Sequence, residues 1–560
     1  MIARLITCAL ALLLLALPAH AEKPDAAALR NEAYEAAQKA MTTSASKALA
    51  QLGARFAAGS DELAKSVRTR QDLTDTLRKL ETDLLQVMSR KGGESASKRE
   101  ALRTKIQETS AKIAAIDEGL NARFPAYAEL ANPKPLSITA TQQLLGPDEA
   151  LALIFVGPEE TFVWAISKTA VDWHRVDIRR KALIASTREL RAGLNPANPV
   201  VMRSALRDFG ATTIEHAGTS APSAPAFNRT TAHHLFSHLI KPLDGIIAPA
   251  KRLYIIGDTP FDSLPFAVLL TQAPTGENAD PAALRASPWL IKRQALVTLP
   301  SVSSLQALRQ AGATPGNQKP FRGFGAPTFK PDPTQQTLAQ GDGNAKSVFL
   351  RGSANLEAIR NLAPLPQTAG ELRQLASALN AAPDSIVLGA AATERAVRSE
   401  DLSKYRVLAF ATHGLLAGDL DGLTEPALAF TPPEKASPED DGLLTASEAA
   451  QLKLAADWVI LSACNTAGGD GTPGADGLSG LARAFFYAGA KSLLVSHWPV
   501  RDDAAARLTT RTLSAQAKDT KLAKAEAYQR AVLELMADTS DPTLAHPAIW
   551  APFVIVGEGR

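Results

Sequence analysis

The sequence has few cysteines, few aromatic residues, no excess of charge of one sign and, beyond its first residues, no long hydrophobic run. Only 2 of 560 residues are cysteine and 5% are aromatic, while 60 Lys and Arg balance 57 Asp and Glu to leave a net charge of +3. Without basic tracts, this balance lacks the electrostatic signature of a nucleic-acid-binding protein. The composition, 46% hydrophobic and 21% charged, is that of a globular protein and excludes disorder throughout the chain.

Residues 1–21 have the order of features typical of a secretory signal peptide. Arg4 precedes an apolar run from Leu5 to Leu17, and Pro18 precedes the small-residue pattern Ala19-His20-Ala21. The alternative is a membrane anchor, but the run is too short for a hydrocarbon core of roughly 30 Å. We therefore expect export to the periplasm or the extracellular space, with no stable membrane anchor after cleavage.

Cleavage after Ala21 would remove Cys8 and leave Cys464 as the only cysteine of the mature chain. A disulfide within that chain is then excluded. A solitary thiol in an oxidising compartment, where cysteines usually pair, suggests a chemical role. The alternative is a small buried hydrophobic residue, which composition alone favours, so the residues around Cys464 have to decide.

Residues 22–132 are predicted to form an α-helical module. Between residues 25 and 124 we expect three helices, the second and third with apolar residues spaced by three and four positions. Gly92-Gly93 separates those two, which predicts an antiparallel helical hairpin, either a coiled coil or a degenerate relative of tetratricopeptide repeats. Such a module would recruit a substrate or a protein regulator.

Residues 133–232 are predicted to form a small β-meander with one helix, and residues 233–560 a larger domain. The meander strands are expected at 150–156, 161–166 and 171–176, with the helix at 179–192. From residue 251 onward, continuously apolar strands alternate with amphipathic helices, which is typical of a three-layer α/β fold with a mostly parallel central sheet. We expect its strands at 253–256, 406–411, 458–462 and 492–495, and helices at 368–379, 393–398, 446–451, 477–487 and 502–513.

Three of these strands end in polar, reactive residues, namely His413, Cys464 and His497. Because reacting groups collect at the carboxyl ends of parallel strands, we expect all three on one edge of the sheet. An imidazole that lowers the pKa of a thiol, or takes its proton, makes that thiol a nucleophile for acyl transfer. Gly414 permits close approach of a substrate, and its N–H and that of Cys464 would form an oxyanion hole.

A series of collinear motifs in the last three-fifths of the chain resembles the CHAT domain, a caspase-like family related to separase. The resemblance extends over about Leu235 to Gly557. The motifs are Gly257-Asp258 with Leu264-Pro-Phe266, Phe410-Ala-Thr-His-Gly414, Glu425-Pro-Ala-Leu-Ala-Phe430, Leu443-Leu-Thr-Ala-Ser-Glu448, Leu461-Ser-Ala-Cys-Asn-Thr466, Gly477 to Phe485, Ala488-Gly-Ala-Lys491, Ser496-His-Trp-Pro-Val500, and His546 to Phe553 with Val556-Gly557.

The resemblance implies a caspase-like fold and a cysteine endopeptidase that cleaves a protein or peptide substrate with a His413/Cys464 dyad. It also implies that an acidic residue holds a basic P1 side chain. Asp502 matches that position in Trp498-Pro-Val-Arg-Asp502, although Pro499 and Arg501 depart from the family pattern. The alternative is that Arg501 pairs with Asp502 or Asp503 and so cancels the subsite.

Other functions remain as alternatives. His413, Cys464 and His497 would suit zinc, and His233, His234 and His238 have helical spacing, but paired ligand motifs are missing, so we expect no metal. The glycine-rich segment 468–477 lacks the Gly-Lys-Ser/Thr of a phosphate loop, and we expect no cofactor. A second hypothesis keeps the fold but makes it a scaffold for protein–protein interaction, with an idle dyad.

Overall fold

The structure is a computed structural model, and it describes most of the chain from residue 135 onward and parts of the N-terminal region. The described residues are 26–41, 69, 73, 76, 77, 80, 96–123, 135–194, 226–258, 261, 263–310, 316–329, 356–415, 420, 423, 426–437, 440–462, 480–498 and 500–560.

The architecture is mixed α/β, organised on one large, mostly parallel sheet. Within the described residues this sheet has 11 strands in the order β3-β2-β1-β4-β5-β14-β13-β12-β8-β6-β7, and a separate small sheet has the order β11-β10-β9. The strands of the large sheet are β1 (Glu149–Val156), β2 (Thr161–Ser167), β3 (Val171–Val176), β4 (Arg252–Gly257), β5 (Ala295–Thr298), β6 (Lys319–Pro327), β7 (Ile386–Gly389), β8 (Tyr405–Ala411), β12 (Trp458–Leu461), β13 (Ser492–Ser496) and β14 (Phe553–Gly557). Those of the small sheet are β9 (Gly414–Leu415), β10 (Ala427–Ala429) and β11 (Leu443–Thr445).

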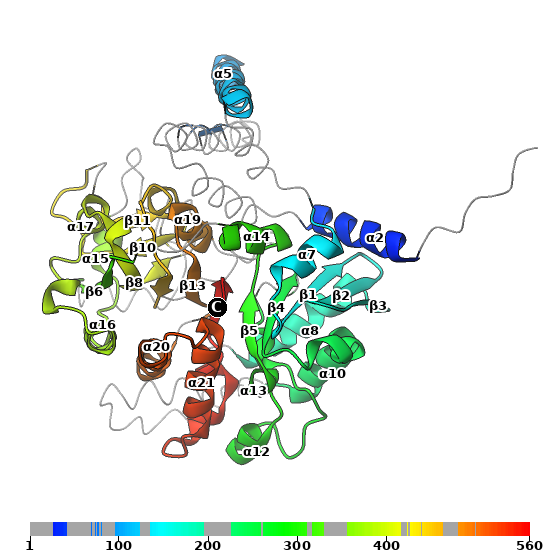
Figure 1. The fold of residues 1–560 in the computed structure, drawn as a ribbon. Helices are drawn as coiled ribbons and strands as arrows, with labels where there is room; N and C mark the ends of the chain where they lie inside the picture. The colour runs from blue at the N-terminus through cyan, green and yellow to red at the C-terminus, as the bar shows by residue number, and fades with distance from the viewer. Residues whose placement is uncertain are drawn as a thin grey trace, which may run out of the picture.

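Helices cover both faces of the large sheet, as Figure 1 shows, so the predicted α/β fold with a mostly parallel central sheet is confirmed. The longer helices are α2 (Ala26–Ala40), α5 (Ala96–Arg123), α8 (Arg180–Gly193), α10 (Arg229–Leu239), α14 (Val302–Gln310), α16 (Thr368–Ala378), α19 (Gly480–Ala488), α20 (Asp502–Lys518) and α21 (Lys524–Ala537). The short ones are α7 (Ile138–Leu144), α11 (Asp244–Ile247), α12 (Pro281–Ala286), α13 (Leu290–Arg293), α15 (Leu356–Arg360), α17 (Glu394–Ser399), α18 (Ala446–Ala449) and α22 (Pro547–Trp550). Five 3₁₀ helices are also present in the described residues: η1 (Lys241–Leu243), η3 (Phe266–Val268), η4 (Pro383–Ser385), η5 (Leu402–Lys404) and η6 (Pro542–Ala545).

Two blocks of parallel strands make up most of the sheet. One contains β1, β4, β5 and β14, and the other contains β13, β12, β8, β6 and β7. The blocks meet where β14 pairs antiparallel with β13, and the antiparallel strands β2 and β3 extend the sheet beyond β1. Strands such as β12, in which all four residues are buried, are apolar on both faces because helices cover both sides of the sheet.

The predicted meander is present and continues the large sheet. Its strand β1 pairs in parallel with β4 over six residues, from Glu149 opposite Arg252 to Ile154 opposite Gly257. The hydrophobic core is accordingly shared, because one cluster of buried side chains runs from Tyr34 to Val556. The domain boundaries at residues 132 and 232 stay predictions.

Helix α2 packs on the meander. Tyr34 is fully buried, its ring centroid lies 6.0 Å from that of Trp164, and its hydroxyl is 3.2 Å from that of Thr141. Gln38 donates to the carbonyl of Leu136 and accepts from the N–H of the same residue. The first and third predicted helices correspond to α2 and α5, whereas most of the second, the hairpin turn and the signal peptide lie outside the described residues. Among the helices that the structure describes, none is both long and apolar enough to cross a bilayer.

Candidate active site

The candidate site lies where β8 and β12 end, at the carboxyl edge of the second parallel block. These two strands pair in parallel with Leu461 opposite Phe410, and the N–H of Ser462 donates to the carbonyl of Phe410 at 3.0 Å. His413 follows Phe410 by three residues. The sequence predicted this edge from two apolar strands and the polar residues that follow them.

His413 is held by a carbonyl and an aromatic ring. Its Nε2 lies 2.7 Å from the carbonyl oxygen of Ala363, and its ring centroid lies 5.5 Å from that of the buried Phe329. A carbonyl oxygen only accepts hydrogen bonds, so this contact requires a proton on Nε2. In the neutral imidazole the lone pair is then on Nδ1, which is the atom suited to take a proton from a nucleophile.

Gly414 begins the small sheet directly after His413. The N–H of Ala429 donates to the carbonyl of His413, while Gly414 lies opposite Leu428 in the antiparallel pair of β9 and β10. In such a pair, hydrogen-bonded and non-hydrogen-bonded positions alternate, so the N–H of Gly414 points away from β10. This orientation suits an N–H that polarises a substrate carbonyl.

Cys464 and the side chain of Asp502 lie outside the described residues, so their positions relative to His413 stay predictions. Asp502 is the first residue of α20, and only its backbone is described. The preceding residue, Arg501, is buried and pairs with Asp503 at 2.7 Å and with Asp541 at 2.8 Å. The predicted alternative in which Arg501 pairs with Asp503 is therefore present.

His497 follows β13, the strand next to β12 in the same parallel block. It is buried, and this burial, together with the charge of Arg191, lowers its pKa to about 3. A pKa this low makes His497 a weak base, which is poorly suited to take the proton of a thiol.

Arg191, at the end of α8, is a contact that the sequence did not predict. Its guanidinium donates to the carbonyl of His497 at 3.3 Å and lies 4.8 Å from the ring centroid of Trp498, and burial lowers its pKa to about 10. Arg191 thereby connects the first half of the chain to the loop after β13. It stands in an ordinary amphipathic pattern 306 residues from His497, and no local signal marks it.

On α10, the rings of His234 and His238 lie together with centroids 4.1 Å apart, whereas His233 bonds elsewhere. His233 Nδ1 lies 3.1 Å from the carbonyl of Leu270, and His238 Nδ1 lies 2.8 Å from the carbonyl of His234. Among the described residues, no group of three His, Cys, Asp or Glu side chains is arranged to hold a metal ion.

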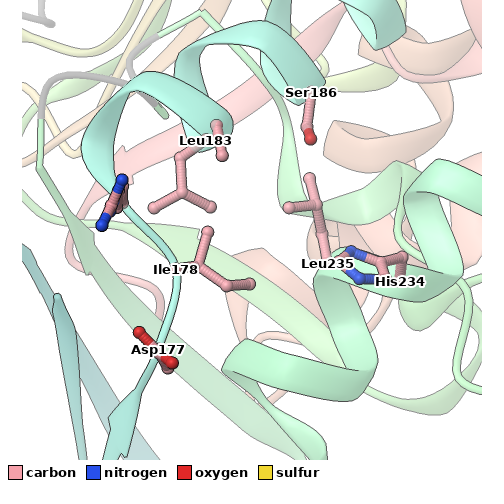
Figure 2. Close-up of a pocket in the computed structure, with 8 residues that line it drawn as sticks. Asp177, Ile178, Leu183, Ser186, His234 and Leu235 are labelled. Carbon is pink, nitrogen blue, oxygen red and sulfur yellow. The ribbon is translucent and has the colours of Figure 1, made fainter. Parts of the chain in front are cut away.

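One open pocket of about 430 Å³ lies between the first half of α8 and the middle of α10. Figure 2 shows Leu183 and Leu235 at its apolar centre, with Asp177, Ser186 and His234 around them. The pocket is lined by Asp177, Ile178, Arg179, Ala182, Leu183, Ser186, His234 and Leu235. None of these residues belongs to the strands or loops that carry His413.

A family model described as the CHAT domain matches residues 229–558, which is more than half of the chain. The chain belongs to the CHAT domain family. The candidate residues His413, Gly414, Cys464 and Asp502 all lie within the matched CHAT domain, whereas α2, α5 and the meander precede it. The sequence-based recognition is confirmed.

Curated relatives of this CHAT domain chain include two proteins named tetratricopeptide repeat protein 28. The mouse (Mus musculus) protein is 24% identical over 488 residues, which cover 78% of this chain and 18% of the relative. The human (Homo sapiens) protein is 28% identical over 223 residues, which cover 35% of this chain and 8% of the relative. The chain therefore spans less than a fifth of the length of these relatives.

Two solved structures illustrate the similarity in fold. The Saccharomyces cerevisiae separase–securin complex has a TM-score of 0.39 and 11% identity, covering 84% of this chain and 34% of that chain. The complex of Porphyromonas gingivalis RgpB pro- and mature domains has a TM-score of 0.30 and 9% identity, covering 60% of this chain and 69% of that chain. At these TM-scores the likeness carries no argument about the site.

Proposed function

We propose that this CHAT domain protein is a cysteine endopeptidase in which Cys464 is the nucleophile and His413 the base. One observation supports the pairing above all others. Leu461 lies opposite Phe410 in adjacent parallel strands, and Cys464 and His413 each follow their paired residue by three positions. Two segments of one chain that follow paired residues at the ends of neighbouring parallel strands start from the same edge of the sheet. Side chains at equal distances along these segments are therefore expected to lie close to each other.

The mechanism follows from the tautomer of His413. Nδ1 takes the proton of the Cys464 thiol, and the thiolate attacks the carbonyl carbon of a peptide bond. The N–H groups of Gly414 and Cys464 stabilise the oxyanion that forms. Protonated His413 then gives its proton to the leaving amine, and water hydrolyses the thioester to regenerate the thiol.

A substrate with a basic P1 residue is part of this proposal. Asp502 at the start of α20 would supply the carboxylate. The ion pair between Arg501 and Asp503 counts against this role, because it is one of the pairings expected to cancel the subsite. The substrate is a protein or peptide, and the N-terminal helices would bind a substrate or a regulator. We also propose export, with a mature chain that begins at Glu22.

The test compares the full chain with its Cys464→Ala variant on a proteome-derived peptide library. We expect cleavage by the parent protein, enriched after Arg and Lys, and its loss by at least about a thousandfold in the variant, because the nucleophile is removed. Asp502→Asn should reduce cleavage after Arg and Lys relative to cleavage after other residues. Identical cleavage by the parent and Cys464→Ala would refute the proposal.

A second candidate function is a scaffold for protein–protein interaction. Trp173 favours it, because this residue on the edge strand β3 is 39% exposed and stacks on Trp164 with a centroid distance of 5.7 Å. Exposed aromatic residues are enriched at protein interfaces. An alkylating peptide probe that labels native and denatured protein at the same rate would support the scaffold and count against the protease.

A further inference from the structure

A buried carboxylate lies beside the strand that leads to Cys464. Glu371, in the first turn of α16, is only 4% exposed, and its Oε2 accepts a hydrogen bond from the hydroxyl of Ser462 at 2.9 Å. Its Oε1 lies 3.0 Å from the hydroxyl of Thr509, a fully buried residue of α20. One carboxylate thus connects α16, α20 and the end of β12.

The place of this contact in the sheet is informative. Ser462 is the residue immediately after β12, and its N–H continues the ladder by donating to Phe410 of β8. Its backbone is therefore held by β8 and its hydroxyl by Glu371. Cys464 follows only two residues later, so these two contacts are the last described restraints on the chain before the thiol.

A buried carboxylate is costly unless hydrogen bonds compensate for its lost hydration, and a hydrophobic residue would serve packing alone. The neighbouring residue Leu372 already anchors α16, because it is fully buried in the main core. Glu371 therefore adds a directional restraint to a helix that is already packed. That restraint acts on the one strand end that leads to the candidate nucleophile.

We propose that Glu371 is a positioning residue for Cys464, acting through its hydrogen bond with Ser462. This inference rests on the proposed protease function and deepens it. The carboxylate restrains the position and orientation of Ser462 at the end of β12. In this proposal, that restraint directs the chain after β12 so that the Cys464 thiol faces His413. Small displacements of a reacting group lower rates steeply, because attack requires a narrow range of distances and angles.

The experiment uses the full chain with four substitutions. Ser462→Ala removes the donor, Ser462→Thr keeps it, and Glu371→Gln keeps an acceptor oxygen without the charge. Thr512→Val is the matched control. Thr512 is a buried threonine of the same helix as Thr509, but among the described residues its hydroxyl bonds within α20, to the carbonyl of Leu508 at 2.7 Å.

Two readouts separate positioning from a structural role: kcat and KM for a cleaved peptide, and the pH dependence of alkylation at Cys464, followed on the peptide that contains it. We expect Ser462→Ala to lower kcat by about tenfold or more with KM within about twofold. Its alkylation midpoint should move upward, toward the value of about 8.5 for a free thiol. Ser462→Thr should restore both, and Glu371→Gln should fall between.

The control decides whether lost stability explains the effect. Thr512→Val should lower the unfolding temperature while leaving kcat and the alkylation midpoint unchanged. An unchanged midpoint and kcat in Ser462→Ala would overturn the positioning role. If the parent shows no Cys464-dependent cleavage, the protease function fails, and alkylation still tests the restraint: a shifted midpoint in Ser462→Ala supports it, and an unshifted one overturns it.

Discussion

Arg501 is the charged side chain that ties the start of α20 to the rest of the fold. Only 5% of its side chain is exposed, and it pairs with Asp503 and with Asp541, which lies before η6. Burial opposes its charge, but the hydrogen bond and the charge of Asp503, followed by those of Asp541, raise the pKa of Arg501 above its ordinary value. Arg501 thereby links the residue before α20 to the segment that begins η6.

We predict that Arg501→Ala destabilises the protein by about 2–3 kcal/mol, because two carboxylates lose a buried partner. The cost lies at the lower end for such pairs because Asp503 and Asp541 are 42% and 30% exposed and keep part of their hydration. Arg501→Lys should recover part of the loss, since it keeps the charge but not the forked geometry. Urea unfolding followed by circular dichroism measures both. An Arg501→Ala variant as stable as the parent would contradict this account.

Sequence patterns could identify His413 and Gly414 but not the groups that hold them. A polar residue directly after an apolar strand is visible in the local pattern, and the register of β8 and β12 agrees with that expectation. The carbonyl of Ala363 and the carboxylate of Glu371 are brought in by segments 50 and 91 residues away from their partners. Such contacts arise from tertiary packing, which no local spacing encodes.

Helix α2 shows how an N-terminal element joins the sheet. Its buried face is narrow, since Tyr34 and Ala37 are its buried residues, and it also forms hydrogen bonds with Leu136 and with the first turns of α7. Asn31 accepts from the N–H of Ile138, and Gln38 bonds both backbone groups of Leu136. Because this contact is narrow, the packing of α2 on the meander should be sensitive to substitution of a single side chain.

Tyr34→Ala is expected to release α2 without unfolding the large sheet. The loss of a fully buried aromatic ring costs about 3–5 kcal/mol, which exceeds the free energy expected to hold α2 on the meander through so small a contact. Hydrogen exchange should rise across residues 26–40 and stay low in β8 and β12. Tyr34→Phe is the control, which loses only the hydroxyl contact with Thr141 and should cost about 1 kcal/mol. Unchanged exchange in α2 of Tyr34→Ala would show that the ring does not hold the helix.

Most strands that the sequence analysis found have plain apolar runs. It missed β14, which also has one, and it missed β5, β6 and β7 for physical reasons. Strand β6 contains glycine and proline, which disfavour strands. The glycine at position 325 is required by close packing, because a Cβ there would lie 2.7 Å from the carbonyl oxygen of Ala411. Strands β5 and β7 have only four residues each, too short for a period to show.

The two halves of the fold are also joined by an ionic cluster around Glu149. This residue starts β1, its side chain is fully buried, and it pairs with Arg252, Arg309 and Arg560 at 3.3, 3.0 and 2.8 Å. Arg309 also pairs with Glu558, just after β14, at 3.0 Å. The cluster thus connects β1, the first strand in chain order, to the residue after β14, the last strand in chain order. The charge state of the cluster should therefore influence the stability of the fold.

We predict that this cluster loses its stabilising effect in acid. Burial alone would raise the pKa of Glu149, but the hydrogen bond from Arg560, followed by the charge of Arg309, lowers it from 4.5 to about 2. A folded-state pKa below the unfolded one stabilises the protein above pH 4.5, and the contribution disappears as the pH falls from 4.5 toward 2. The lowered pKa corresponds to about 3 kcal/mol.

Urea unfolding of the parent and of Glu149→Gln, measured at several values between pH 7 and pH 3, tests this prediction. At pH 7 the substitution should cost about 3–5 kcal/mol, because three arginines lose their carboxylate, and the gap between the two proteins should narrow as the pH falls. Glu534→Gln is the control: its ion pair with Arg511 is 61% exposed on the glutamate side, so it should cost less than about 1 kcal/mol at any pH. A gap that stays constant down to pH 3 would mean that Glu149 does not titrate with folding, and the ionic link between β1 and the residue after β14 would then contribute nothing that depends on its charge.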